Sequence, residues 1–353
     1  MMKKLVFLLT TLFLVLLLAA CGDNDSEAAS EEAADGPAES VAANDAQYTI
    51  RASIGLNSDH PQYKGLLKFK EIVEEETNGA IAVETYHSGQ LGDDRTAMEA
   101  LQLGSQEVTI PSTSPVANFI SEFAIFDIPF LFPNAQVADS VLDGEIGTKL
   151  LEMLEEQNLV GLAYWENGFR DMSNNTRPIE SAADFKGLKI RTMENDLHLA
   201  VFRELGANPT PMAMPEVFTA LQQGSVDGQE NPLSTIYIEG LYEVQEYVSS
   251  TNHIYTPFVF LVSKSFYDSL PEDFQEIVRS AAVESGQYQR EINREATEGF
   301  KQSLIDEGVE FTEVSEEAKA EMREAVLPVV EEYADTIGKD LVEEMYQAVE
   351  DAQ

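Results

Sequence analysis

Two arginines are the side chains in this sequence that are best suited to bind a small anion. The chain has 22 Lys and Arg residues against 63 Asp and Glu residues, and its formal net charge is −41. Arg170 ends the segment Trp-Glu-Asn-Gly-Phe-Arg, and Arg191 ends the segment Leu-Lys-Ile-Arg. A guanidinium presents a planar fork of N–H donors that matches a carboxylate with two parallel hydrogen bonds. Each arginine therefore either holds a carboxylate ligand or pairs with a protein acid, and composition leaves both alternatives open.

Asn231 is a candidate amide for the same kind of site. It lies in the segment Asp-Gly-Gln-Glu-Asn-Pro, residues 227–232, which follows a predicted helix. This composition is typical of a tight turn. Asn231 is therefore either a turn former or a donor to a ligand, and the residues alone favour the turn.

The sequence contains no familiar catalytic or metal-binding motif. The chain has four histidines, all isolated from one another: His60, His87, His198 and His253. No His-x-x-x-His or Cys-x-x-Cys spacing, Gly-x-Ser-x-Gly elbow or Walker loop occurs. A buried or capping role is expected for each histidine, and the adjacent acids at positions 93 and 94 are typical of a helix start. We therefore expect no enzymatic activity, no metal and no cofactor.

The first residues have the layout of a secretory signal peptide, predicted over residues 1–20. Lys3 and Lys4 precede an apolar run over residues 5–18, which is shorter than the roughly 20 residues of a bilayer span. The run leads into Leu-Ala-Ala-Cys, which resembles a bacterial lipobox. Cys21 is the only cysteine, so it cannot form an internal disulfide and is better suited to lipidation. An ordinary signal peptide with an incidental cysteine is the alternative.

The segment after this cysteine predicts a disordered acidic tether over residues 21–46. It is rich in Ala, Ser, Asp and Glu, lacks Lys and Arg, and has almost no large apolar side chains to bury. About 305 residues remain for the globular part, a length that favours two lobes over one core. The net charge of −41 makes nucleic acid and anionic membrane surfaces poor partners. A solvated surface suited to saline or alkaline surroundings is the simplest explanation of this acidity.

The globular part alternates strands and helices in two successive sets. The first set has predicted strands over residues 48–54, 80–86 and 108–110 and helices over 66–77 and 93–104. The second has predicted strands over 159–165, 169–173 and 188–191 and helices over 197–205 and 216–223. This order predicts α/β layers with a largely parallel sheet. Right-handed crossovers would place the connecting loops at one edge of the sheet, and two such sets imply a cleft between them.

A long helix is predicted near the carboxyl end. The helical pattern runs from residue 271 to about 306, whereas helices of globular proteins usually have about 8 to 20 residues. A helix of this length could brace both lobes. Two further amphipathic helices, over residues 316–333 and 339–349, complete the chain.

Six segments resemble the solute-binding subunit of tripartite ATP-independent periplasmic (TRAP) transporters, the DctP-like family. They follow in family order over residues 87–95, 174–178, 184–191, 206–212, 216–222 and 226–232. The resemblance extends from about residue 48 to the end of the chain. It implies an α/β fold with two lobes, like a periplasmic binding protein (a Venus flytrap), in which the long C-terminal helix braces both lobes. The implied lobes are residues 47–167 plus about 256–296, and residues 168–255 plus about 297–353.

The resemblance also implies which residues bind the ligand. Arg191 matches the arginine that clamps the ligand carboxylate, Arg170 a second ligand-facing arginine, and Asn231 the amide that orients the same carboxylate. Four further positions complete the expected site, two from each lobe: Asp94 and Ser112, and Glu194 and Met214.

Three positions depart from the sialic-acid-binding branch of this family. That branch has an acidic residue in place of Ser112, an amide in place of Glu194 and an aromatic residue in place of Met214. A smaller acid is therefore expected, either a four-carbon dicarboxylate or a sugar acid such as a hexuronate.

The resemblance further implies an extracytoplasmic binding protein that delivers its organic acid to TRAP integral-membrane subunits for ion-coupled uptake. A lipid anchor would hold it at the outer face of the cytoplasmic membrane. Two alternatives share the two-lobed plan: a binding protein of an ATP-driven importer, and a sensor that presents its ligand-bound form to an envelope receptor. An envelope enzyme is less favoured.

Overall fold

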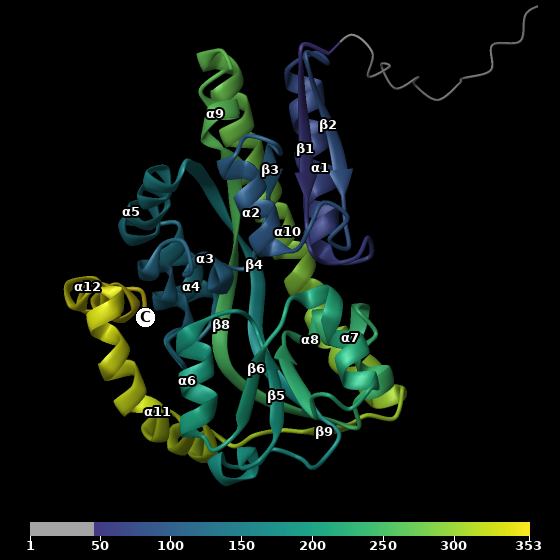
Figure 1. Cartoon of the computed structure of the whole chain (residues 1–353), viewed down its shortest axis with the longest axis vertical. Coiled ribbons are helices and arrows are strands. Elements are labelled where there is room, and N and C mark those ends of the chain that lie inside the picture. Colours follow the sequence, from purple (N-terminus) through teal and green to yellow (C-terminus); the bar gives the residue numbers. More distant parts are fainter. Residues whose placement is uncertain (1–45) are drawn as a thin grey trace, which may run out of the picture. The chain divides into compact units, whose positions relative to one another are not determined.

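The computed structural model describes residues 46–353 (Figure 1). The predicted signal peptide over residues 1–20, the lipidation site Cys21 and all but the last residue of the predicted tether lie outside the described residues. None of the helices described between residues 46 and 353 has the length and apolar character needed to span a membrane.

The first α/β set has the order that its hydrophobic pattern predicts. Its elements are β1 (Tyr48–Ser53), α1 (Pro61–Glu76), β2 (Ile81–Tyr86), α2 (Asp94–Gln102) and β3 (Val108–Thr109). Strand β1 pairs in parallel with both β2 and β3. Alternate residues of β1 and one stripe of α1 are buried together in an apolar core. The loops that follow β1 and β2 consequently lie at the same end of the sheet, as expected for parallel strands.

Side chains at the starts of α1 and α2 fix where these helices begin. The imidazole of His60 accepts a hydrogen bond from the Gln62 amide at 3.1 Å, and Asp93 accepts one from the Thr96 amide at 2.8 Å. Such caps satisfy amide groups that have no partner within the helix. The predicted capping roles of His60 and of the acidic pair at α2 are confirmed for His60 and Asp93.

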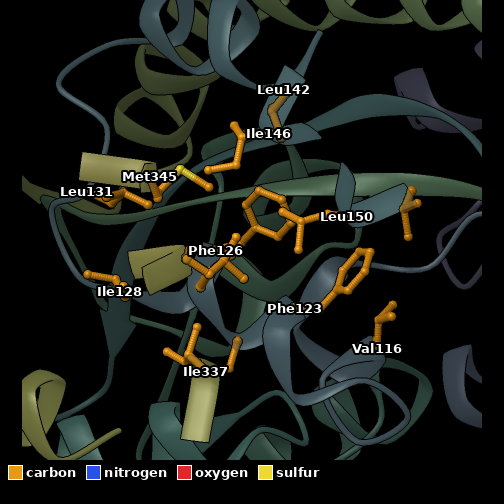
Figure 2. Close-up of a cluster of buried hydrophobic side chains, with 14 of the residues drawn as sticks. Val116, Phe123, Phe126, Ile128, Leu131, Leu142, Ile146, Leu150, Ile337 and Met345 are labelled. Carbon is orange, nitrogen blue, oxygen red and sulfur yellow. The ribbon is translucent and has the colours of Figure 1, made fainter. Parts of the chain in front are cut away.

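Short helices connect the first set to the centre of the sheet. They are α3 (Thr113–Val116), the 3₁₀ helix η1 (Ser121–Asp127), α4 (Ala135–Leu142), α5 (Glu145–Met153) and the 3₁₀ helix η2 (Leu154–Gln157). Their apolar side chains form a core that also includes residues from the C-terminal part of the chain (Figure 2). Phe126 and Met345, more than 200 positions apart in sequence, both belong to this core.

Two long antiparallel strands form the centre of the sheet. Strand β4 (Leu159–Asn174) pairs with β8 (Tyr247–Ser263), and Figure 1 shows them side by side. The sequence predicted two separate strands in place of β4, because residues 166–168 read Glu-Asn-Gly and interrupt the apolar pattern. The structure instead keeps one strand, which absorbs the interruption through register shifts at three places. Gly168 has φ +121°, a conformation that favours glycine, and this explains the residue at one of these shifts.

The second α/β set follows β4. Its main elements are the 3₁₀ helix η3 (Ala182–Phe185), β5 (Lys189–Thr192), α6 (Asp196–Glu204), β6 (Asn208–Pro211), α7 (Met214–Gln222), β7 (Gly228–Asn231), α8 (Leu233–Ile238) and the 3₁₀ helix η4 (Leu241–Val244). Strand β5 pairs in parallel with β6 and β7. The tight turn predicted over residues 227–232 is wrong, because residues 228–231 form β7. Pairing with both β4 and β5 overrides the local turn preference of this segment.

The nine strands found between residues 46 and 353 form one mixed sheet. The order is β2-β1-β3-β8-β4-β7-β5-β6, and β9 (Glu310–Thr312) pairs in parallel with β8. The prediction of a largely parallel sheet therefore holds only for the outer parts. The centre is antiparallel, because β3, β8, β4 and β7 pair with one another in opposite directions. The long strands β4 and β8 run through both sets and connect them.

The long helix α10 (Glu272–Asp306) has 35 residues and contacts elements of both sets. It packs against α1 and β4 along one part and against α8 along another. Gly65 of α1 and Gly286 of α10 allow both helices to approach Trp165, since an added Cβ would lie only 2.7 Å and 2.6 Å from the indole ring. The predicted long helix that braces both lobes is thus confirmed.

Three other helices belong to the C-terminal part: α9 (Lys264–Tyr267), α11 (Glu316–Ile337) and α12 (Lys339–Asp351). Helix α11 contacts α6 of the second set, whereas α12 packs against α4 and α5. The range 297–353 was expected to belong with the second lobe. Its last helix nevertheless packs on residues 135–153, which fall within the first predicted lobe, because the apolar face of α12 completes the core shown in Figure 2.

Candidate functional site

A cavity with about 640 Å³ of empty space, open to solvent, lies between the two α/β sets. The first set lines it with the loop after β1 and the amino-terminal ends of α1 and α2, and the connecting helix α3 adds its own amino-terminal end. The second set lines it with the end of β5, the loop that follows, the start of α7 and the end of β7. The central strands contribute Asn167 of β4 and Phe258 of β8. Residues far apart in sequence are thus brought to one place by the sheet topology.

Arg191 of β5 is a buried guanidinium at this cavity. Its side chain is 2% exposed, and Nε and Nη2 donate to the carbonyl oxygen of Met212 at 2.9 Å and 2.6 Å. The Nη1 atom is buried and has no partner within residues 46–353. Burial lowers the pKa of Arg191 to about 10, so the group remains charged at neutral pH. Because two of the five N–H bonds of a guanidinium are used, three remain available on the Nη1 and Nη2 edge.

Arg170 of β4 has a different environment. Its side chain is fully buried beside Glu230, and Nη2 donates to the Glu230 side chain at 2.9 Å and to the Glu230 carbonyl oxygen at 2.6 Å. Burial raises the pKa of the Glu230 carboxyl, but the Arg170 charge and the hydrogen bonds of His253 and Arg170 together outweigh this effect and hold the pKa well below its usual range. Arg170 does not line the cavity. Of the two alternatives that the sequence left open, the pair with a protein acid is the one that the structure shows for Arg170.

The Arg170–Glu230 pair lies directly behind Asn231. Nη2 of Arg170 donates to Oδ1 of Asn231 at 3.0 Å, and Nδ2 of Asn231 faces the Gln229 side chain. Asn231 lines the cavity, so these contacts fix the orientation of its amide at the cavity wall. Arg170 thereby influences the cavity through a neighbour and not by direct contact.

Besides Asp93, which caps α2, two acidic residues line the same cavity as Arg191. Asp94, at the start of α2, accepts a hydrogen bond from the Ser112 amide at 3.2 Å. Burial raises the pKa of Asp94 to about 7, although the Ser112 amide and Arg191 act in the opposite direction. Glu194 follows β5, and its carbonyl oxygen accepts a hydrogen bond from Asn118 at 2.7 Å. The cavity thus combines one buried positive charge with three acidic residues, one of which, Asp93, caps a helix.

Several buried polar atoms that lack a partner converge on the cavity. Among residues 46–353 they include Nη1 of Arg191, Oγ of Ser112, Oε1 of Gln62 and Oδ1 of Asn167, and all four residues line the cavity. A buried polar group without a partner costs about 1–3 kcal/mol. Such a concentration of these groups in one cavity is the pattern expected of a site that a polar ligand completes.

The structure brings together six of the seven ligand-binding residues that the sequence predicted. Those that line the cavity are Asp94, Ser112, Arg191, Glu194, Met214 and Asn231. Arg170 is the residue that does not. Their contact with a ligand stays a prediction, because the structure establishes only their position.

Sequence reasoning missed Gln62 and Asn167. Gln62 follows the capping residue and proline at the start of α1, and Asn167 lies in the Glu-Asn-Gly interruption of β4. The only available signal was the polar interruption in an otherwise apolar strand. Apolar side chains, among them Met214 and Phe258, complete the walls. No group of three or more His, Cys, Asp or Glu side chains among the described residues is arranged to hold a metal ion.

The match to a protein-family model covers residues 52–336. This family is described as bacterial extracellular solute-binding protein, family 7, and its short name is DctP. The chain belongs to this family. The resemblance to TRAP solute-binding proteins that the sequence motifs indicated is thereby confirmed, and the proteins of this family bind solutes for transport and are not enzymes.

A curated relative within the family is the C4-dicarboxylate-binding periplasmic protein DctP of Rhodobacter capsulatus. The two are 39% identical over 295 residues, which are 83% of this chain and 88% of the relative. The chain therefore spans nearly the whole length of this DctP protein.

Two solved structures show the family 7 fold with different organic acids. The sugar acid binding protein DctPAm of Advenella mimigardefordensis, in complex with galactonate, is 44% identical with a TM-score of 0.85 over 86% of this chain and 98% of that one. A TRAP periplasmic solute-binding protein of Sulfurospirillum deleyianum with bound succinate is 33% identical with a TM-score of 0.81 over 85% and 98%. The predicted two-lobed fold is confirmed by these neighbours.

Proposed function

We propose that this family 7 protein binds a small organic acid by its carboxylate, with Arg191 as the group that holds the acid. The observation that carries the proposal is the buried guanidinium at the cavity, whose Nη1 atom has no protein partner in the described part of the chain. A buried charge without a counter-ion is unfavourable, and a ligand carboxylate would supply the missing charge. The succinate and galactonate bound by the two similar structures are acids of this kind.

The neighbouring groups have defined roles in this proposal. Met212 holds the guanidinium through its carbonyl oxygen, so that the Nη1 and Nη2 edge faces the ligand carboxylate. Asn231 contributes its amide beside this carboxylate, and Arg170 keeps that amide in place. Met214 and Phe258 exclude water from the ligand, which strengthens the charge-assisted hydrogen bonds.

The ligand would be enclosed by closure of two lobes, each of which contains one of the two α/β sets. Strands β4 and β8 pass between the two sets and carry the register shifts at which they could bend. A ligand drives closure when some of its contacts form only in the closed state. Such contacts would come from Asp94 and Ser112 on one side of the cavity and from Arg191 and Glu194 on the other. The closed form would then deliver the acid to TRAP integral-membrane subunits for ion-coupled uptake.

We also propose that Cys21 is lipidated and anchors the protein at the outer face of the cytoplasmic membrane. The Leu-Ala-Ala-Cys segment and the absence of a second cysteine support this role. Incorporation of a labelled fatty acid in cells should depend on Cys21 and should be lost in Cys21→Ser. Labelling that persists in Cys21→Ser would contradict the anchor without affecting the ligand site.

The carboxylate site is tested by calorimetric titration of Arg191→Ala with a panel of sugar acids and dicarboxylates. Two charge-assisted hydrogen bonds contribute about 3–6 kcal/mol, so affinity for the bound acid should fall at least about 100-fold. Arg191→Lys should also weaken binding strongly, because an ammonium cannot replace the planar fork. Arg323→Ala removes the same charge from an exposed position on α11 and should leave affinity within about twofold.

A folded Arg191→Ala protein that keeps wild-type affinity would overturn the role of Arg191. Folding of each variant is checked by its thermal unfolding, since a ligand that binds only the native state raises the melting temperature. A variant that unfolds normally and gains no thermal shift from the acid has lost binding specifically.

A further inference from the structure

We infer that the cavity selects a monocarboxylate that carries several hydroxyl groups, such as an aldonate or a uronate, over a dicarboxylate. This inference rests on the proposed function, since it assumes that Arg191 holds the one carboxylate. It specifies which chemical groups the rest of the ligand must carry and which residues of the cavity bind them.

The first reason is the number of positive charges. Of the two basic residues that line the cavity, only Arg191 is buried. Arg95 is about half exposed, and its Nε lies 3.3 Å from Oε1 of Glu99 on the surface of α2. The cavity therefore provides one enclosed positive charge for one carboxylate. A second carboxylate would have no buried cation to pair with.

The second reason is the position of the acids. Asp94 and Glu194 line the same cavity, one from each α/β set. Neither carboxyl forms an ion pair within residues 46–353, and the one hydrogen bond recorded for them is the Ser112 amide to Asp94. A dicarboxylate held at Arg191 would bring its second negative charge into this acidic part of the cavity. Like charges disfavour that arrangement, whereas hydroxyl groups would donate to both acids.

The third reason is an excess of hydrogen-bond acceptors. Oε1 of Gln62 is a buried acceptor without a partner, and its identity is fixed because Nε2 donates to the Ile110 carbonyl oxygen at 2.7 Å. Asp94, once ionised above its pKa of about 7, and Glu194 add acceptors at the same cavity, so a ligand donor has at least three side chains to pair with. Ionised carboxylates only accept hydrogen bonds, whereas each hydroxyl can donate one. A polyhydroxy acid satisfies these acceptors, and succinate leaves them unsatisfied.

The inference is tested by calorimetric titration of the wild-type protein with D-galactonate, D-glucuronate, D-erythronate, succinate and the neutral polyol galactitol. At least one hydroxylated acid should bind about 100-fold more tightly than succinate, because its hydroxyl groups donate to two or more acceptors of the cavity that succinate leaves without a donor. Galactitol should not bind measurably, because it cannot pair with Arg191.

Two variants that remove an acidic charge test whether Asp94 and Glu194 favour the hydroxylated acid over the dicarboxylate. Asp94→Asn and Glu194→Gln preserve side-chain volume but remove the negative charge, and the titrations are made at about pH 8, where Asp94 with its pKa of about 7 is ionised. Each should weaken binding of the hydroxylated acid and strengthen binding of succinate, so that the ratio between the two affinities narrows by about tenfold. Arg95→Ala tests the other arginine that lines the cavity and, because this side chain is about half exposed beside Glu99, should change succinate affinity by no more than about twofold.

The outcomes separate this inference from the function on which it rests. If succinate binds as tightly as every hydroxylated acid and Arg191→Ala abolishes its binding, the carboxylate site stands and the inference is wrong. A tenfold loss of succinate affinity in Arg95→Ala would also overturn it, because Arg95 would then act as a second cation. If no hydroxylated acid in the panel binds the folded protein, the inference fails. Binding of a hydroxylated acid that survives Arg191→Ala refutes the proposed function itself.

Discussion

The buried pair of Arg170 and Glu230 allows a sharp test of how the cavity wall is built. Removal of one partner leaves an uncompensated charge at a fully buried position, because both side chains are 0% exposed. Arg170→Met should therefore lower the free energy of unfolding by about 3–5 kcal/mol, and Glu230→Met should have a similar effect. The double variant removes both charges at once. It should be destabilised by at least about 2 kcal/mol less than the sum of the single variants.

The stability of these variants can be measured by urea unfolding with an intrinsic probe. Trp165 is the only tryptophan of the chain and is completely buried, so its fluorescence reports global unfolding. Arg95→Met, which breaks an exposed pair with Glu99 on α2, is the matched control and should change stability by less than about 1 kcal/mol. Additive effects of Arg170→Met and Glu230→Met would refute the reasoning, since additivity means that the two side chains do not interact.

The same variants separate a positioning role of Arg170 from direct ligand contact. Arg170 donates one charge-assisted hydrogen bond to Asn231, and its loss would leave the Asn231 amide at the cavity but less well oriented, which should weaken the contact of this amide with the ligand by about 1 kcal/mol. The folded double variant should therefore bind the organic acid about fivefold more weakly, which is far less than the loss of about 100-fold expected for Arg191→Ala. An affinity loss as large as that of Arg191→Ala would show that Arg170 contacts the ligand after all.

Three further perturbations give outcomes that the structure determines. Gly286→Ala should destabilise the protein by about 1–3 kcal/mol in urea, because the new Cβ would lie 2.6 Å from Trp165, whereas Gly299→Ala, with no atom within 4 Å, should stabilise it by up to about 1 kcal/mol. The raised pKa of Asp94, about 7, means that the native state without ligand keeps its proton at a higher pH than the unfolded state. Relative to Asp94→Asn, the wild type should therefore lose about 1–3 kcal/mol of stability as pH rises from about 4 to 7, and equal pH profiles of the two proteins would contradict the raised pKa. Ser112→Ala removes a buried hydroxyl without a partner, so thermal unfolding of the ligand-free protein should be unchanged or shifted upward while affinity for the acid falls about 3- to 15-fold in calorimetry.

Local patterns were sufficient to predict most helices and the first strands. Apolar spacing and capping residues are properties of neighbouring positions, so the helices that begin at residues 94 and 316 and the long helix α10 were within reach of the sequence. The motifs that resemble TRAP binding proteins added the family, which the family model confirms. They also supplied the candidate residues at the cavity. Asp94, Ser112 and Glu194 would not have been selected from composition, because acids and serines are common throughout this chain.

Strand pairing, in contrast, depends on contacts between distant segments. The turn-like segment at residues 227–232 became a strand because β4 and β5 supply hydrogen-bond partners on both of its sides. The two predicted strands before residue 174 merged into β4 because β8 continues beside them across the interruption. No local pattern contains this information, since each pairing brings together residues that lie tens of positions apart.

Arg170 and Arg191 show most clearly what the sequence determined and what only the tertiary structure decided. Each follows an apolar residue within a predicted strand, so their types and positions established that two guanidinium groups were available to bind acids. The register of β4 against β7 then places Glu230 opposite Met172, within reach of Arg170, and neutralises that arginine inside the protein. Within residues 46–353, Arg191 pairs only with the carbonyl oxygen of Met212 and keeps unpaired N–H groups at the cavity. The free energy of a buried charge depends on what surrounds it in space, and for these two arginines the surroundings come from residues at least 20 positions away in the sequence.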